Sequence, residues 1–234
     1  MKPLFTAVTE GDTVEIKRLL KNGADIHHTD TNGLTALHIA AKQRNTEVIQ
    51  LLIEKGAKID ATDMYSRTPL HSAFYCNNVE GLRLLLKKGS NLDAVNDRSQ
   101  SPLHLAANNS NIEALTVLLD NGAYIDALDE SKKTPLYYAA SNEYVHVVKE
   151  LIRKGAKVGA SDKGGDAPLQ YAAWNGHAQV VEALIEKGAK VDASDEGGRT
   201  PLHSAARNGH VQAVKALVEK AADMDAIDKD GHSS

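Results

Sequence analysis

The segment Thr200-Pro201-Leu202-His203-Ser204-Ala205-Ala206 decides the fold, because versions of it return along the whole chain at one spacing. All six prolines fall on a grid whose slots are 33 residues apart, as from 168 to 201. They are Pro3, Pro69, Pro102, Pro135, Pro168 and Pro201, with Ala36 in the vacant slot. Leucine follows every slot, at Leu4, Leu37, Leu70, Leu103, Leu136, Leu169 and Leu202. A period of this length is typical of proteins built from stacked structural repeats.

Each repeat reads as two helices followed by a loop. Threonine or serine before proline predicts a helix start, because the hydroxyl caps free N–H groups and proline at the first position loses no hydrogen bond. A polar break then precedes a second apolar run at helical spacing, such as residues 48–53. Gly56 is expected to end that helix in the left-handed conformation. Asp63 and its equivalents are expected to form the turn that opens the next loop.

The TPLH-x-A-A motif, the Gly-Ala-x-Ile-Asp-Ala segment and the 33-residue period resemble the ankyrin-repeat family over essentially the whole chain. The resemblance implies an all-α solenoid of stacked antiparallel helix pairs, with hairpin loops along one edge, and recognition of proteins through loop tips and inner helices. We expect a single domain over residues 1–234. Its repeats would be 1–29, 30–62, 63–95, 96–128, 129–161, 162–194 and 195–227, with a partial repeat at 228–234.

Three places depart from the pattern. Ala167 replaces a capping threonine, which predicts a loss of about 1 kcal/mol. Ala221 replaces the glycine that ends the second helix, at roughly 1–2 kcal/mol, so the final repeat is expected to fray or to end differently. Lys17 and Arg18 occupy columns held by Gln50 and Leu51 in the next repeat, which predicts a polar end cap.

Composition excludes several classes of function. The net charge is −4, with 27 basic and 31 acidic side chains interspersed, so no basic stripe for nucleic acid is present. No apolar run approaches the ~18 residues of a membrane span. The single cysteine, Cys76, fits a reducing compartment. We therefore expect a monomeric protein inside the cell, cytoplasmic or nuclear, or a bacterial protein delivered into a host cell.

No catalytic, cofactor or metal motif is found. Segments of the GxxxxGK[ST], GxSxG, HExxH and GxGxxG types are absent from the sequence. His38, His71, His104 and His203 share one column. Successive repeats stack about 10 Å apart, and zinc ligands each lie about 2 Å from the ion, so these imidazoles are expected to bond the loop backbone. We predict no enzyme, no metal site and no cofactor.

The partner-binding surface should lie where the columns vary. Interface hot spots favour Trp, Tyr and Arg, and aromatic residues are only 4% of this chain. Tyr65, Tyr75 and Trp174 fall in columns expected to face the groove, whereas Tyr138 and Tyr171 could equally fill gaps between helices. The predicted partner-binding residues are Met64, Tyr65, Arg67, Tyr75, Arg98, Lys133, Tyr138 and Trp174. The mixed charge around them favours a specific protein partner.

Four functional interpretations remain open. The first is a non-catalytic protein-binding scaffold. The second is a regulatory stack cut from a larger enzyme, channel or delivered effector, which the abrupt end at Ser234 favours, while Met1 and the end cap favour a natural start. The third is an engineered repeat protein, against which the irregular repeats 63–95 and 129–161 argue. The fourth is binding of a nucleotide or short RNA on aromatic platforms, which the negative net charge disfavours.

Overall fold

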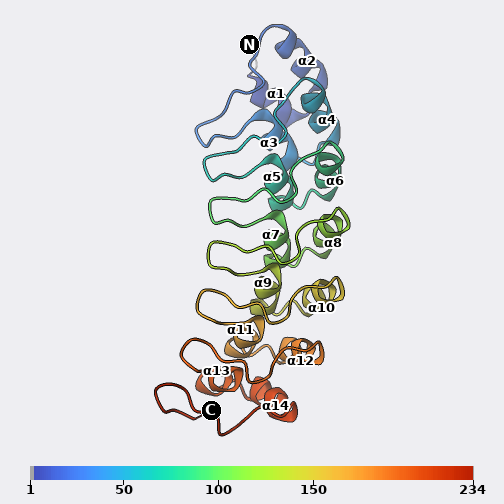
Figure 1. The fold of residues 1–234 in the computed structure, drawn as a ribbon. Helices are drawn as coiled ribbons and strands as arrows, with labels where there is room; N and C mark the ends of the chain where they lie inside the picture. Colours follow the sequence, from blue (N-terminus) through green and yellow to red (C-terminus); the bar gives the residue numbers. More distant parts are fainter. Residues whose placement is uncertain (1–2, 234) are drawn as a thin grey trace. The chain divides into compact units, whose positions relative to one another are not determined.

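The computed structural model describes residues 3–233, so Met1, Lys2 and Ser234 of the predicted first and partial repeats lie outside it. Within these residues the chain forms fourteen α-helices, two to a repeat (Figure 1). The seven first helices are α1 Leu4–Glu10, α3 Ala36–Lys42, α5 Pro69–Tyr75, α7 Pro102–Asn108, α9 Pro135–Ser141, α11 Pro168–Trp174 and α13 Pro201–Arg207. The seven second helices are α2 Thr13–Lys21, α4 Thr46–Glu54, α6 Val79–Lys87, α8 Ile112–Asp120, α10 Val145–Arg153, α12 Ala178–Glu186 and α14 Val211–Glu219.

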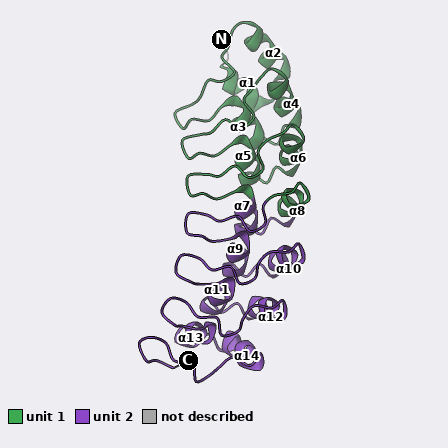
Figure 2. Cartoon of the chain, viewed as in Figure 1, with its two compact units in different colours: residues 1–102, 113–123 green, residues 103–112, 124–234 purple. Residues whose placement is uncertain are grey.

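The chain divides into two compact units, residues 1–102 with 113–123 and residues 103–112 with 124–234 (Figure 2). In the first unit α1, α3 and α5 pack side by side, and α2, α4 and α6 form a second row. In the second unit α9, α11 and α13 form the inner row, and α10, α12 and α14 form the outer row. Within each unit the hairpin loops leave on the side of the first helices (Figure 1). The predicted all-α stack of antiparallel helix pairs is confirmed.

The threonine–proline signal sets the start of the first helices as predicted. Thr35 caps α3, with its hydroxyl 3.5 Å from the backbone nitrogen of His38. The hydrogen bonding is reciprocal, because His38 Nδ1 accepts the backbone N–H of Thr35 at 3.1 Å. Thr200 and His203 repeat the arrangement at 3.4 and 3.2 Å. Gly56 ends α4 with φ of 91°, the left-handed conformation that glycine adopts without steric cost.

The aspartate that opens each loop holds a turn, also as predicted. Oδ1 of Asp63 accepts the backbone N–H groups of Tyr65 and Arg67, both at 2.9 Å. Within each unit, neighbouring loop tips are joined by one main-chain hydrogen bond, for example from Asp97 N to Tyr65 O at 3.0 Å in the first unit. In the second unit Glu196 N donates to Gly164 O at 3.1 Å. Each unit therefore presents its loops as a hydrogen-bonded series.

The core consists mainly of leucine, isoleucine, valine and alanine, as the shortage of aromatic residues implies. Ile16, Leu52, Leu85 and Leu151 are each fully buried, and alanines such as Ala73 let first helices approach closely. The first repeat is a polar cap as predicted, because Lys17 and Arg18 are exposed.

The missing cap at Ala167 is confirmed, since its side chain makes no capping hydrogen bond. Gln170 compensates for the missing histidine of that repeat. Its Oε1 accepts the N–H of Ala167 at 2.9 Å, and its Nε2 donates to Ala193 O at 2.8 Å. Glutamine thus replaces histidine as the side chain that ties the helix start to a loop.

The prediction that Ala221 frays the last repeat is wrong. Helix α14 has 9 residues, the same length as the other second helices, and Ala221 takes the left-handed conformation with φ of 64°. The packing of α14 on α12 and α13 holds this strained residue in place. We expect Ala221→Gly to raise the free energy of unfolding by about 1 kcal/mol. Urea denaturation followed by circular dichroism measures it; a glycine variant less stable than the parent would contradict the assignment of strain.

Candidate protein-binding surface

The first unit carries an exposed cluster on the loop and inner helix of the third repeat, beside the next loop. Tyr65, Tyr75 and Met64 are 43%, 48% and 60% exposed, unusually high for such large apolar side chains. A hollow of about 270 Å³, here called the Tyr65 hollow, has both tyrosines in its lining. It is lined by Tyr65, Arg67, Tyr75, Asn96, Asp97, Arg98 and Gln100.

Arg67 organises this cluster. Its guanidinium pairs with Asp63 at 2.6 Å and lies 4.6 Å from the centre of the Tyr65 ring and 5.8 Å from that of Tyr75. Burial by itself would raise the pKa of Asp63, but hydrogen bonds from the side chain and backbone of Arg67 outweigh it and lower that pKa. Arg67 therefore has its charge satisfied within the repeat and orients two tyrosine rings. Arg98 is exposed at the neighbouring loop tip.

Lys133 and Tyr138 are largely engaged inside the second unit. Lys133 Nζ lies 4.3 Å from the centre of the Tyr137 ring and 5.2 Å from that of Tyr171. The Tyr138 hydroxyl donates to Asp129 Oδ2 at 2.6 Å. Both side chains are half-buried, so of the two expectations for Tyr138 the structure favours gap filling.

Tyr137 and Tyr171 form a pair that the sequence did not predict, with ring centres 4.3 Å apart. Burial raises the pKa of the Tyr137 hydroxyl, and the neighbouring Tyr171 adds to the effect. Tyr137 and Tyr171 belong to neighbouring columns of successive repeats, because they are 34 residues apart and the period is 33. Only their placement on facing turns of α9 and α11 brings the rings together.

Trp174 is 46% exposed at the end of α11, where it borders two hollows. The one of about 380 Å³ is here called the Trp174 hollow. It is lined by Asp166, Gln170, Tyr171, Trp174, Asp195, Arg199 and Ser204. An adjoining hollow of about 360 Å³ shares Trp174 and Arg199 and adds Arg207 and His232. Asp166 was not among the predicted binding residues, although it stands in a column that holds arginine at 67 and 199.

Histidines of the shared column make hydrogen bonds to the loop backbone, as predicted. His38 Nε2 lies 2.9 Å from Arg67 O, and His104 Nε2 lies 3.0 Å from Lys133 O. His71 Nδ1 bonds Thr68, while its buried Nε2 faces Gln100 without a hydrogen bond of standard geometry. Burial lowers the pKa of His38, His71 and His104, which keeps these rings neutral.

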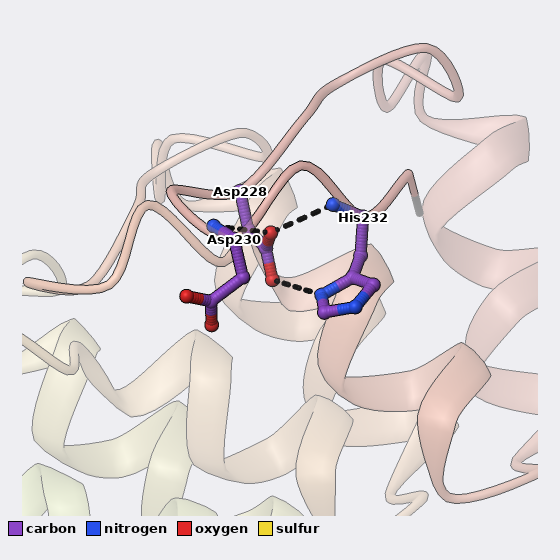
Figure 3. Close-up of side chains that lie close together, drawn as sticks. All are labelled: Asp228, Asp230 and His232. Carbon is purple, nitrogen blue, oxygen red and sulfur yellow. Dashed lines mark hydrogen bonds and ion pairs between the residues drawn. The ribbon is translucent and has the colours of Figure 1, made fainter.

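Asp228, Asp230 and His232 bring potential metal-ligating atoms within 4.8 Å of one another (Figure 3). Asp228 Oδ1 accepts the N–H groups of Asp230 and His232 at 3.0 and 2.9 Å. Asp228 Oδ2 lies 3.4 Å from His232 Nδ1. This is the loop turn that Asp63 forms in the third repeat, so we assign the cluster to loop structure. Among residues 3–233, no helix is long and apolar enough to cross a membrane.

The helix pairs and the loop series define a helical repeat protein, and its exposed aromatic residues lie on the loops and first helices. The family model described as ankyrin repeats (3 copies) matches residues 4–96, 88–162 and 146–228. The chain therefore belongs to the ankyrin-repeat family, whose repeats typically mediate protein–protein interactions and are generally non-catalytic.

Two solved structures are similar over nearly the whole chain. One is the ankyrin repeat domain of Bcl-3, described as a unique member of the IkappaB protein family, with 29% identity and a TM-score of 0.83. That match covers 93% of this chain and 98% of the other. The second is the human ASB11 ankyrin repeat domain, with 26% identity, a TM-score of 0.82, and coverage of 95% and 99%. Comparison with curated proteins gave no match.

Proposed function

We propose that this chain is a non-catalytic scaffold, that it binds one partner protein inside the cell, and that the Tyr65 hollow with Met64 is the centre of that contact. The observation that carries the proposal is the exposure of Tyr65 and Tyr75 around Arg67 in a chain with few aromatic residues. Rigid aromatic side chains give large contact area at a small entropy cost, which is why they dominate interface energetics. A single continuous domain over residues 1–234 remains part of the proposal.

The charged side chains around the Tyr65 hollow favour a protein partner over a polyanion. Arg67 is neutralised by Asp63, and Asp97 stands beside Arg98, so the hollow offers both signs. A nucleic-acid surface would present several unpaired cations along one path. The Lys133, Tyr138 and Trp174 part of the predicted surface belongs to the second unit and is a separate part of the proposal.

The test is capture of a partner from a cell lysate by the wild type and by Tyr65→Ala/Tyr75→Ala/Arg98→Ala. We expect the triple variant to lose at least about tenfold in affinity for the captured protein, because hot-spot truncations each cost about 2 kcal/mol or more. Circular dichroism shows whether it is folded. Tyr124→Ala is the matched control, since Tyr124 is 59% exposed outside both hollows.

Equal capture of the same protein by the wild type and the triple variant would place the contact elsewhere. Binding of RNA that falls steeply with salt, with no protein retained, would favour the nucleic-acid interpretation. The regulatory-stack interpretation predicts that the retained protein is joined to this chain in a longer natural polypeptide.

A further inference from the structure

The sixth repeat lacks an ion pair that the third and seventh repeats possess. In the third repeat Asp63 pairs with Arg67 at 2.6 Å, and in the seventh Asp195 pairs with Arg199 at 2.8 Å. These pairs join the first residue of the loop to the residue four positions later. In the sixth repeat the same two positions are Asp162 and Asp166. The acid is retained, and a second acid replaces its basic partner.

The other charged groups around Asp166 already have partners. Arg199 donates through Nε to Asp195 at 2.9 Å, and Lys133 lies over the Tyr137 ring. Asp162 accepts the N–H of Gly164 at 2.8 Å, with the Tyr171 hydroxyl 3.4 Å away. The Asp166 carboxylate, in contrast, accepts no hydrogen bond from residues 3–233. It is half-buried at the wall of the Trp174 hollow.

The third repeat shows what a cation does at this place. There the guanidinium of Arg67 pairs with the carboxylate of Asp63 and also lies 5.8 Å from the centre of the Tyr75 ring. Trp174 stands three periods beyond Tyr75, and Asp162 three periods beyond Asp63. The sixth repeat therefore keeps the counterparts of Asp63 and Tyr75 but not the guanidinium, and Gly164 stands in the place of Tyr65. The adjoining hollow, which adds Arg207, offers no such excess of acid.

We propose that the Trp174 hollow binds an arginine or lysine side chain of the partner protein. Asp166 supplies the counter-charge and Trp174 the ring face, the two groups that Arg67 finds in its own repeat. An exposed tryptophan is the strongest of the aromatic rings for a cation. Arginine is expected to bind better than lysine, because its planar guanidinium stacks on a ring and pairs with a carboxylate at once. The inference rests on the proposed function and names the chemistry of one partner residue.

Trp174 is the only tryptophan in the chain, so its fluorescence reports on the two hollows that it borders, and the Asp166 variants separate them because Asp166 lines only the Trp174 hollow. The probe is the pentapeptide acetyl-Gly-Ala-Arg-Ala-Gly-amide, and its control carries citrulline, which is neutral but nearly the same shape as arginine. We expect a saturable change in Trp174 emission with the arginine peptide and at least about tenfold weaker binding of the citrulline peptide. Equal binding of the two peptides, or no saturable response to either, would overturn the proposal.

Three variants locate the charge. Asp166→Asn should weaken the arginine peptide about tenfold, because a charge-assisted hydrogen bond is lost. Asp166→Arg should abolish binding by restoring the intrinsic cation of the third and seventh repeats, with the fold intact by circular dichroism. Glu196→Gln removes a charge from the next loop outside the hollow and should bind as the wild type does. Wild-type binding by Asp166→Asn would contradict the assignment.

Binding should also weaken as the pH falls through about 6. Burial, followed by Asp162 and Asp195, raises the pKa of Asp166 to about 6, against the lowering effect of Arg199 and Lys133. The other titratable groups on the wall are Tyr171, Asp195 and Arg199. Burial raises the pKa of Tyr171, so it stays protonated here, and Asp195 is paired with Arg199 at 2.8 Å. The basic peptide requires the ionised carboxylate, whereas Asp166→Asn should lose this pH dependence.

Failure of this inference is distinguishable from failure of the proposed function. Partner capture that depends on Tyr65, Tyr75 and Arg98 while the peptide gives no Trp174 response rejects the cation site alone. A Trp174 response that depends on Asp166, with capture indifferent to the Tyr65 hollow, rejects that hollow and keeps the cation site.

Discussion

Acidification from pH 7 to pH 4.5 is expected to lower the free energy of unfolding by roughly 2 to 3 kcal/mol through His71 alone. Burial lowers the pKa of His71 from 6.5 to about 4, with the Gln100 backbone and Asp63 opposing the shift. The unfolded chain therefore binds a proton between pH 6.5 and 4 that the folded chain excludes. Stability contributed by this ring is complete above pH 6.5 and is lost as the pH falls toward 4.

His71→Gln isolates this contribution, because Gln170 performs the same structural role without titrating. We expect the variant to fold and to lose roughly 2 to 3 kcal/mol less than the wild type over the same pH interval. Urea denaturation at both pH values gives the difference. Asp166, whose raised pKa acts in the opposite direction, is present in both proteins and cancels. Equal acid losses in the two proteins would show that His71 is not the responsible group.

Replacement of Asn78 by alanine is expected to cost about 3 kcal/mol. Asn78 is 3% exposed and caps α6, with Oδ1 accepting the N–H of Gly81 at 2.8 Å. Its Nδ2 also donates to Ala41 O of the preceding repeat at 2.8 Å. Alanine removes the cap and leaves a buried carbonyl without its donor. The lost cap and the lost hydrogen bond both lie at the interface between the second and third repeats.

Asn78→Ser separates the two losses. Serine can cap α6 but is too short to reach Ala41 O, so we expect it to recover about 1 kcal/mol of the alanine loss. Thermal and urea unfolding of the three proteins measure the series. A cost below about 0.5 kcal/mol for Asn78→Ala, the range of ordinary surface changes, would refute the role of the buried amide.

The repeating residues made the fold predictable. Proline, leucine and glycine columns define helix starts, buried positions and helix ends through local chemistry that needs no tertiary information. Asn78 marks the limit of prediction from local sequence. Its column predicts a polar residue between two helices, but its hydrogen bond to Ala41 O depends on the packing of the preceding repeat. Gly81 is explained only by that bond, because a Cβ there would collide with the Asn78 amide.

The candidate surface was predictable in part. The variable columns identified Tyr65, Tyr75 and Trp174 as exposed, and the structure agrees. The sequence did not reveal that Lys133 lies over the rings of Tyr137 and Tyr171, since the three residues belong to different helices and loops. Asp166 could have been found, because it places a second carboxylate four residues after Asp162, in a column that holds a basic residue at Arg67, Lys133 and Arg199. Which residues contact a partner stays a prediction.

The hydrogen bonds between loop tips use main-chain atoms only, as from Asp97 N to Tyr65 O and from Glu196 N to Gly164 O. The one side chain that holds each turn is the acid or amide that opens the loop, such as Asp63 or Asn96, and the contacts between tips do not depend on the side chains of the tip residues. Recognition residues can therefore be exchanged by point mutation without a compensating change in the neighbouring loop. A new binding specificity can therefore arise one substitution at a time, while the packed helices and the main-chain bonds between loops stay under separate selection.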